Sequence, residues 1–437
     1  MLLAPPVATA TDHSGSRGPL AHGAAGVLLV AIAAALHVVR QRETPAWDSL
    51  WAEDASVFLT DAYRDFGGTL LEQNGGYVHV VPRLIGGIAA LFPLEDAAVV
   101  FAVAGSIVVA LLAAFVYAAS AEVLRSRSLR LGLAAAVALL PIAGSELYAN
   151  ALNLHFYLVY VCFWALVWQA ETRAAIAARS SAALAATLSD PVCALLLPLA
   201  VVGPVARRSR GAVAVSLSFG AGLAVQLVLM RGGANPERNW AFSVWDVPDI
   251  FSLRVAGGLL VGDRFLDDAW LSLGRAFSVA AVAILATVIV VLAIGNTRRT
   301  VVFSLIALTY AGLFLGVHLA GRGTGGMDPE LGSFHLEGAR YALLPFLFVL
   351  TAVLTLVDGT RWSHAAWIRI AAVLWIVALL GANYAVGPNT RSSGPRWSVE
   401  LWSADRACLA DTAATARVLA APAPPQVWFA RIPCSRL

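Results

Sequence analysis

Residues Ala97–Ala121 read AAVVFAVAGSIVVALLAAFVYAASA, a stretch without a single charged side chain. A helix needs roughly 20 apolar residues to cross a hydrocarbon layer about 30 Å thick, because each residue adds about 1.5 Å. Inside lipid the backbone can satisfy its hydrogen bonds only within its own helix or a closed barrel. The sequence therefore predicts an all-α polytopic membrane protein. The predicted spans are Leu20–Val39, Ala97–Ala121, Leu129–Ile142, Leu154–Ala170, Ala212–Met230, Ala276–Ile294, Val301–Ala320, Tyr341–Val357 and Ala365–Val386.

One apolar segment, Ala182–Val205, is interrupted by Ser189-Asp190-Pro191 and has arginines on both flanks. Arginines concentrate on the cytoplasmic side of membrane proteins. The segment is therefore interpreted as a hairpin of two short half-helices with an outward tip. Counted as two spans, it brings the predicted total to eleven.

Composition supports this class and excludes others. The 437 residues are 59% hydrophobic and 13% charged, and the net charge is only +3. This charge is too small to indicate a nucleic-acid partner, and the sequence contains no basic block of the kind that binds nucleic acid. The glycine-rich run Gly321–Gly326 lacks the Gly-Lys-Ser/Thr of a nucleotide-binding loop. It is interpreted as a flexible outer loop.

Charge also predicts the orientation. Arg125, Arg127 and Arg130 fall in one short loop, Arg298 and Arg299 in another, and Arg361 and Arg369 near a third. The positive-inside rule then places the N-terminus in the cytoplasm. Eleven spans place the C-terminus outside. We expect a multi-pass protein of the cell membrane with a membrane domain at 1–386, long outer loops at 40–96 and 231–275, and an extracytoplasmic tail at 387–437.

The first outer loop carries the most informative chemistry. Glu53-Asp54 is an acidic pair soon after the first span, and an interfacial or re-entrant helix is predicted at Leu84–Phe92, a run too short to cross the membrane. A carboxylate whose pKa is tuned by its surroundings can act as a general base. The alternative is that Asp54 caps a helix over Ala55–Phe66.

Other polar residues are expected at the same outer level. An arginine here suits bidentate binding of a phosphate, although a lone arginine at a helix end is more often an anchor. The candidate substrate- or phosphate-binding residues are Arg340, Tyr341, Arg83, His79, His155, Asn153, Asp190 and Tyr77, and Glu146, His335 and Glu337 lie nearby in the sequence.

Two of the four cysteines, Cys408 and Cys434, fall in the tail. In an oxidising compartment such a pair is a disulfide candidate. The alternative is two free thiols, and no zinc-site spacing is present.

This layout resembles the GT-C class of membrane glycosyltransferases. The resemblance rests on Glu53-Asp54 in the first outer loop, on the interfacial helix and on the span count. The wider sequence, including Trp51-Ala52-Glu53-Asp54, Gly338-Ala339-Arg340-Tyr341 and the two tail cysteines, is most similar to uncharacterised actinobacterial-type envelope proteins.

The resemblance implies a hexosyl or pentosyl transferase that uses a polyprenyl-phosphate sugar as donor and a glycan or lipid as acceptor. Asp54, with Glu53 as runner-up, would deprotonate the acceptor with inversion at the sugar, while Arg340 and Arg83 neutralise the leaving phosphate. No cofactor is fixed; a divalent metal, Mg²⁺ or Mn²⁺, stays open because some members need one.

Three alternatives remain. An O-antigen-polymerase-like enzyme would rely on arginines in the 231–275 loop, and a lipid-linked glycan transporter or flippase would use the broken helix at Asp190. A non-catalytic envelope scaffold would leave the acidic pair merely solvated.

Overall fold

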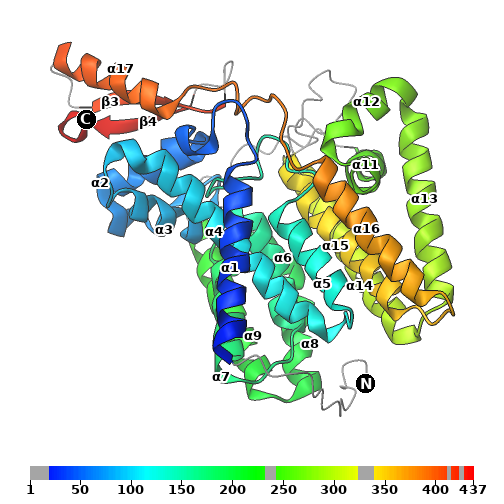
Figure 1. Ribbon diagram of the computed structural model, residues 1–437. Helices are drawn as coiled ribbons and strands as arrows, with labels where there is room; N and C mark the ends of the chain where they lie inside the picture. The colour runs from blue at the N-terminus through cyan, green and yellow to red at the C-terminus, as the bar shows by residue number, and fades with distance from the viewer. Residues whose placement is uncertain (1–18, 232–242, 323–338, 411–414, 423–427) are drawn as a thin grey trace.

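The computed structural model is predominantly helical, with two small antiparallel hairpins (Figure 1). It describes residues 19–231, 243–322, 339–410, 415–422 and 428–437; His335, Glu337 and most of the glycine-rich run lie outside these ranges. In the described chain, six helices are long and apolar enough to cross a membrane. These are α4 (Ala97–Ala119), α9 (Arg210–Met230), α13 (Arg275–Ile294), α14 (Arg298–Arg322), α15 (Ala339–Gly359) and α16 (Ala365–Ala382). The chain is thus a helical protein of the membrane type.

The other predicted spans also form helices. One is α1 (Pro19–Val38), and four are shorter than the six above: α5 (Arg127–Ala138), α6 (Leu154–Val167), α7 (Arg173–Thr187) and α8 (Leu197–Arg207). The prediction that α5 continues to Ile142 is wrong, since the helix ends at Ala138 and Pro141 and Gly144 follow in irregular backbone. Likewise α16 ends at Ala382, and Gln41 forms a β-bridge with Val386 where helix was expected.

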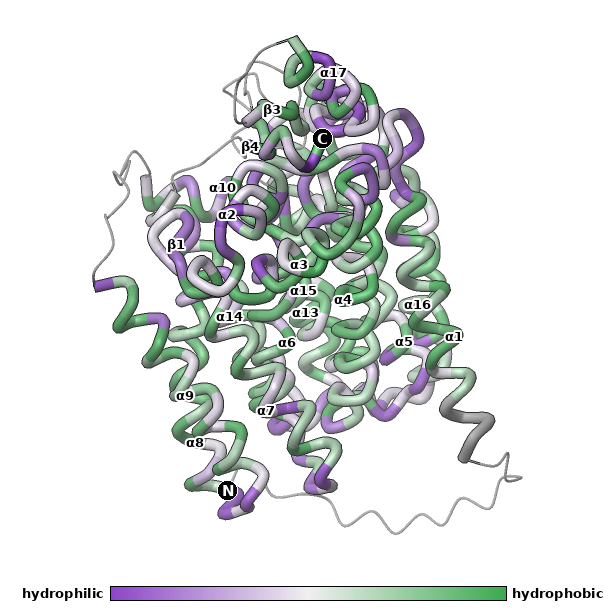
Figure 2. Tube along the Cα trace, turned by 90° about the vertical axis from the view of Figure 1, so that its left-hand side faces the viewer, coloured by the Kyte–Doolittle hydropathy of each residue, from purple (hydrophilic) through white to green (hydrophobic). Residues whose placement is uncertain are grey.

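Hydropathy follows this architecture. The middle of the molecule is hydrophobic, and hydrophilic residues gather at its two ends (Figure 2). Helix α15 is almost wholly buried and packs against α14, α6, α16 and α5. We call the end that carries residues 40–96, 139–153 and the tail the loop end. The opposite end, with Arg125, Arg207, Arg298 and Arg361, is called the arginine end.

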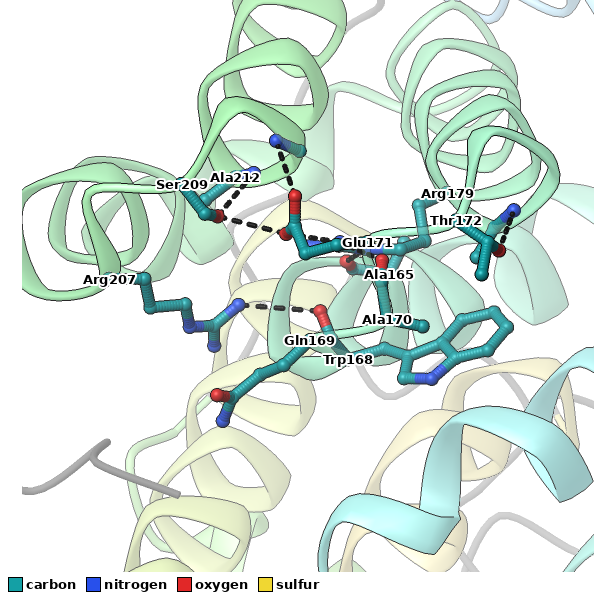
Figure 3. Close-up of polar contacts among 12 residues, drawn as sticks. Ala165, Trp168, Gln169, Ala170, Glu171, Thr172, Arg179, Arg207, Ser209 and Ala212 are labelled. Carbon is teal, nitrogen blue, oxygen red and sulfur yellow. Dashed lines mark hydrogen bonds and ion pairs between the residues drawn. The ribbon is translucent and has the colours of Figure 1, made fainter. Parts of the chain in front are cut away.

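The interrupted segment is a hairpin. Helix α7 runs to Ser189-Asp190, and η5 (Pro191–Leu196) and α8 return from that tip. Both legs of the hairpin meet the C-terminal end of α6. Arg179 donates to the carbonyls of Ala165 and, just beyond the helix, Ala170, and Arg207 donates to those of Leu166 and Val167. Figure 3 shows Arg179 and the further bond from Arg207 to the carbonyl of Trp168. Cations are favourable at a helix C-terminus, where carbonyls lack partners. The two arginines therefore fix both legs of the hairpin at the arginine end.

Glu171 joins this connection to the next helix. Its carboxylate accepts from Ser209 Oγ at 2.9 Å and from the N–H of Gly211 at 3.0 Å, at the start of α9 (Figure 3). A carboxylate at a helix N-terminus is stabilised by the helix dipole. The hairpin is thus attached to both α6 and α9 at its open end.

The first long loop is compact. It contains the short helix η1 (Ala46–Asp48), the π-helical turn η2 (Asp54–Leu59), α2 (Thr60–Thr69), a two-stranded hairpin of β1 (Gln73–Asn74) and β2 (Tyr77–Val78), α3 (Val80–Ala89) and η3 (Leu94–Asp96). Helix α3 begins four residues before the predicted interfacial run. Exposed Leu84, Ile88 and Leu91 give α3 one apolar side. This is the pattern of a helix lying at a membrane interface.

The tail packs on that loop. It consists of α17 (Trp397–Ala410) and the antiparallel strands β3 (Thr415–Ala420) and β4 (Trp428–Pro433), which lie above α2 and α3 in Figure 1. Strand β4 contacts η2, and Trp397 Nε1 donates to the carbonyl of Leu94. The 243–273 segment is also helical, with α10 (Asp246–Ile250), η6 (Phe251–Gly257), α11 (Gly258–Val261) and α12 (Asp263–Leu273), and its η6 packs on α13 and α15.

Candidate functional site

An irregular segment, residues 139–153, lies at the centre of the loop end. Every residue from Leu140 to Asn153 is buried although none is helical. Buried backbone without secondary structure needs other hydrogen-bond partners, because an unpaired N–H or C=O costs free energy. Side chains from distant parts of the chain supply them here.

Asp54 and Arg391 are the main suppliers. The two carboxylate oxygens of Asp54 accept from the N–H groups of Ala151 and Leu152 at 3.0 and 2.8 Å. The Arg391 guanidinium donates to the carbonyls of Tyr148, Ala149 and Ser49. Asp54 and Arg391 are each only 1% exposed. Together they fasten the first long loop and the tail to the 139–153 segment.

Two alanines in these turns adopt the left-handed region. Ala52 has φ 22° and Ala149 has φ 46°, a conformation that costs a non-glycine residue of order 1–3 kcal/mol. Ala421 of the tail holds the first turn, since its carbonyl accepts from the N–H of Ala52 and its N–H donates to the carbonyl of Leu50. Strain maintained by surrounding contacts is typical of functional sites. Here Ala52, the first of the two, directly precedes Glu53 in the chain.

Glu53 is partly exposed, and it lies within electrostatic range of Arg340 at the start of α15. Arg340 Nη1 donates to Glu146 Oε1 of the 139–153 segment at 2.6 Å, and its guanidinium covers the ring of Tyr341 at 5.0 Å. Arg340 thus forms an ion pair with Glu146 and interacts electrostatically with Glu53. Glu53, Glu146 and Arg340 form what we call the charged pole of the site.

Asp54 differs from Glu53 in its surroundings. Burial raises the pKa of Asp54 from 3.8 to about 7, although the two backbone donors and the charge of Arg391 act in the opposite direction. With both oxygens already accepting hydrogen bonds and 1% exposure, Asp54 has little access to a substrate. Its geometry is that of a group that holds the backbone.

A second cluster lies at the hairpin tip. His155 Nδ1 is 2.7 Å from Asp190 Oδ2, and Asp190 Oδ1 accepts from the N–H of Val192, capping η5. The His79 ring lies 5.3 Å from that of His155 and 4.3 Å from that of Tyr77. His79, His155, Asp190 and Tyr77 form what we call the imidazole pole. A carboxylate bound to one imidazole nitrogen orients the ring and leaves the other nitrogen for a ligand.

Aromatic rings connect the two poles. Phe156 contacts His155 at 4.0 Å and Tyr341 at 6.1 Å, and His318 of α14 lies 5.5 Å from Tyr341. Tyr341 in turn lies under Arg340. Residues predicted from five separate stretches of sequence thus lie in one continuous group.

The remaining predicted residues lie elsewhere. Arg83 is buried, donates to Asp61 at 2.9 Å and lies 5.8 Å from the ring of Phe58, so its salt bridge belongs to the first long loop rather than to either pole. Asn153 donates to the carbonyl of Glu146 and so supports the 139–153 segment.

The two tail cysteines are bonded to each other. Cys408 and Cys434 form a disulfide with a Cα–Cα distance of 5.8 Å, joining α17 to the residue that follows β4. The pair lies in the tail, away from both poles, so it stabilises the part of the tail that packs on η2.

Three residues of this region escaped sequence reasoning. Arg391 looked like any other tail arginine, and only its tertiary contacts distinguish it. Arg254 in η6 is 2% exposed and interacts electrostatically with Asp263, Asp267 and Glu146. His318 lies in an apolar helix. A lone arginine or histidine inside an apolar run was the available signal for the last two.

The side chains of the two poles do not indicate a particular metal or cofactor. In the described part of the chain, no three His, Cys, Asp or Glu side chains are grouped so that they could hold a metal ion. The two poles therefore contain three carboxylates, an arginine and two imidazoles, with aromatic rings between them.

The chain matches no model of a known protein family, and no curated protein sequence matches it significantly.

Proposed function

We propose that this protein is a cell-membrane glycosyltransferase that crosses the bilayer eleven times, with its loop end on the extracytoplasmic side. Helices α5 and α6, at 12 and 14 residues, are shorter than the hydrocarbon layer. The buried 139–153 segment between them covers the part of the hydrocarbon layer that the two short helices do not span. Irregular backbone is tolerated at that depth where protein surrounds it.

The observation that carries the proposal is the charged pole, where Arg340 pairs with Glu146 and interacts electrostatically with Glu53, beside an aromatic path to two imidazoles. A lipid-linked sugar phosphate presents an anion, a sugar ring and a long hydrocarbon chain at one membrane level. Arginine suits the phosphate, and aromatic rings suit the sugar.

In the proposed reaction, a carboxylate takes the proton of an acceptor hydroxyl. The hydroxyl oxygen forms a bond to the anomeric carbon, and the bond from that carbon to the phosphate oxygen breaks with inversion. Polyprenyl phosphate leaves with the electron pair, and Arg340 stabilises the negative charge that develops on it. The phosphate would replace Glu146 as the partner of Arg340.

We assign the role of general base to Glu53 and that of positioning residue to Asp54, which reverses the order that the sequence favoured. A general base must reach the proton that it removes. Glu53 is the more exposed of the two and interacts electrostatically with Arg340, whereas both Asp54 oxygens are bonded to backbone.

The test is envelope glycan composition in a deletion strain that expresses wild type, Glu53→Gln or Glu95→Gln at matched membrane levels. Glu95 is an exposed glutamate of the same loop and serves as the control. We expect one sugar linkage to disappear on deletion and to return with wild type and Glu95→Gln. With Glu53→Gln, it should return at a rate lower by a factor of 10²–10⁴. Full rescue by Glu53→Gln would contradict the assignment.

A second candidate, an O-antigen-polymerase-like enzyme, is favoured by Arg254. This buried arginine of the 243–273 segment lies near Glu146, so a second cation is available beside the charged pole. The two candidates differ in product. Arg254→Gln would shorten a glycan chain if the enzyme is a polymerase, whereas a single-sugar transferase would lose the linkage without any change in chain length.

A further inference from the structure

A large apolar cavity extends from η6 and α11 to the connection between α15 and α16 at the arginine end. Its volume is about 470 Å³, and only alanine, leucine, isoleucine, valine and tryptophan line it. Its walls come from η6, α11, α13, α15, α16 and the connection before α16, and they include Leu260, Val288, Val353, Trp362 and Trp375. Apolar cavities of about 150 Å³ already exclude water and take up hydrocarbon ligands. A cavity of this size is therefore suited to hydrocarbon.

The cavity is reached from the lipid side. Ile284, Val288 and Val291, on its α13 wall, are 48%, 39% and 43% exposed although they lie in a span-length apolar helix. Helix α13 stands at the edge of the molecule (Figure 1). Because lipid chains surround such a helix, a lipid is the molecule with direct access.

Cations border the same end of the cavity. Arg298 follows α13 in the chain, and Arg361 precedes α16; both are exposed. The N–H of Arg361 donates to the carbonyl of Gly295, and Asn296 Nδ2 donates to that of Leu356, so the two connections lie side by side. The acid at this end of α15, Asp358, is bound to Arg369 and to the backbone of Arg125, so it leaves the two arginines available to an anion.

Tryptophan adds to this arrangement. Trp362 lies in the connection between α15 and α16, close to Gly295, where a Cβ atom would come within 2.5 Å of the indole nitrogen. Tryptophan is enriched at the membrane–water interface. An apolar groove, an interfacial tryptophan and two arginines therefore follow one another in the order of a phospholipid's chain, glycerol region and phosphate.

We propose that this cavity is a binding site for an anionic phospholipid, with an acyl chain between α13 and α16 and the phosphate between Arg298 and Arg361. Basic pockets between membrane helices bind anionic headgroups in this way. The site is separate from the charged pole and does not depend on the proposed transferase activity.

The experiment uses the full-length protein, purified and delipidated in detergent. Phosphatidylglycerol or phosphatidylcholine with identical acyl chains is added, and thermal unfolding and lipid retention by native mass spectrometry are measured. We expect phosphatidylglycerol to bind about ten-fold more tightly, because each arginine near the membrane surface attracts an anionic headgroup.

Two variants localise the site. Arg298→Gln with Arg361→Gln should remove the preference for phosphatidylglycerol, and Ala372→Phe, which fills the groove, should reduce retention of both lipids. The controls are Arg231→Gln, an exposed arginine at the loop end, and Ala224→Phe on the exposed side of α9. If Ala372→Phe does not fold, the double arginine variant still tests whether Arg298 and Arg361 bind the anionic headgroup.

Equal binding of the two lipids by wild type would overturn the proposal, because the headgroup would then contribute nothing. A preference that persists in the double arginine variant would also overturn it, since the anionic lipid would then be bound elsewhere.

Discussion

At the scale of single residues, the irregular 139–153 segment at the centre of the site is held by side chains that bond to its backbone. Arg391 donates to three buried carbonyls from two segments, and its guanidinium lies 5.1 Å from the ring of Tyr148. A planar guanidinium with five donors can do this, whereas the single ammonium of lysine cannot reproduce the fork.

The first residue-scale prediction concerns this arginine. Arg391→Met should lower the free energy of unfolding by on the order of 3 kcal/mol, because buried carbonyls lose their partners. Arg391→Lys should recover part of that loss. Thermal or denaturant unfolding in detergent measures the effect, and Arg396→Met, an exposed arginine of the same tail, is the control. Equal stability of the two methionine variants would contradict the stabilising role of the Arg391 hydrogen bonds.

A second residue-scale prediction follows from the raised pKa of Asp54. Between pH 4 and 7 the unfolded carboxyl is ionised, whereas the folded one, with a pKa of about 7, still binds its proton. The folded state then holds more protons, so its stability falls as the pH rises through this window. Above pH 7 this contribution no longer changes.

Thermal unfolding of wild type and Asp54→Asn between pH 5 and 8 checks the sign. Wild type should lose stability with rising pH more steeply than the variant. Asp263, with a pKa raised to about 6 by burial, is present in both proteins and cancels from the difference. Parallel curves would mean that Asp54 does not titrate in this range.

The same residue shows why one substitution is a poor test of catalysis. In asparagine at position 54 an NH2 group replaces one carboxylate oxygen, so a donor would face one of the Ala151 and Leu152 N–H groups. Loss of function in Asp54→Asn would therefore report misplacement of the backbone as well as loss of a base. Glu53→Gln lacks this ambiguity.

At the scale of elements, apolar runs predicted the helices well, because bilayer thickness fixes length and composition together. Helix α4 begins at the predicted Ala97, and α7 and α8 form a hairpin as predicted. The predicted start of that hairpin at Ala182 is wrong, because α7 begins at Arg173 and so includes Arg173 and Arg179, which were expected to flank it. The end of α5 was missed, because the apolar pattern continues to Ile142 while the backbone does not. That backbone is satisfied by Arg40 and Asp263, which bond to Leu140 and Pro141, and no local pattern encodes such partners.

Packing between elements gives a further prediction. A Cβ atom at Gly105 of α4 would lie 2.6 Å from the carbonyl oxygen of Asn150, so Gly105→Ala should cost about 1–3 kcal/mol through overpacking. Gly220→Ala on α9 is the matched control, because nothing lies within 4 Å of its Cβ position. Alanine favours the helix by about 1 kcal/mol over glycine. The two substitutions should thus change stability in opposite directions, as measured by unfolding in detergent.

At the scale of the whole molecule, sequence predicted the level at which polar residues gather but not their partners. The predicted residues His155, Asp190 and His79 do lie together. The two predicted phosphate-binding arginines have separate partners, since Arg340 pairs with Glu146 and Arg83 pairs with Asp61. The end of the molecule at which a residue lies follows from the boundaries of the apolar helices, and these can be read from the local sequence. The residues that it contacts depend on the fold of the 139–153 segment, which is held by Asp54 and Arg391 from distant parts of the chain.

The position of Arg391 also has a consequence for biosynthesis. Membrane helices emerge in order from the N-terminus, so the 139–153 segment is synthesised roughly 240 residues before the arginine that bonds to Tyr148 and Ala149. Until Arg391 has been synthesised, those carbonyls lack their final donor. A chain that stops before Arg391 would carry every acid of the charged pole without the arginine that bonds to Tyr148, Ala149 and Ser49. Such a chain could place its apolar helices in the membrane, but its 139–153 segment would lack the contacts that hold it.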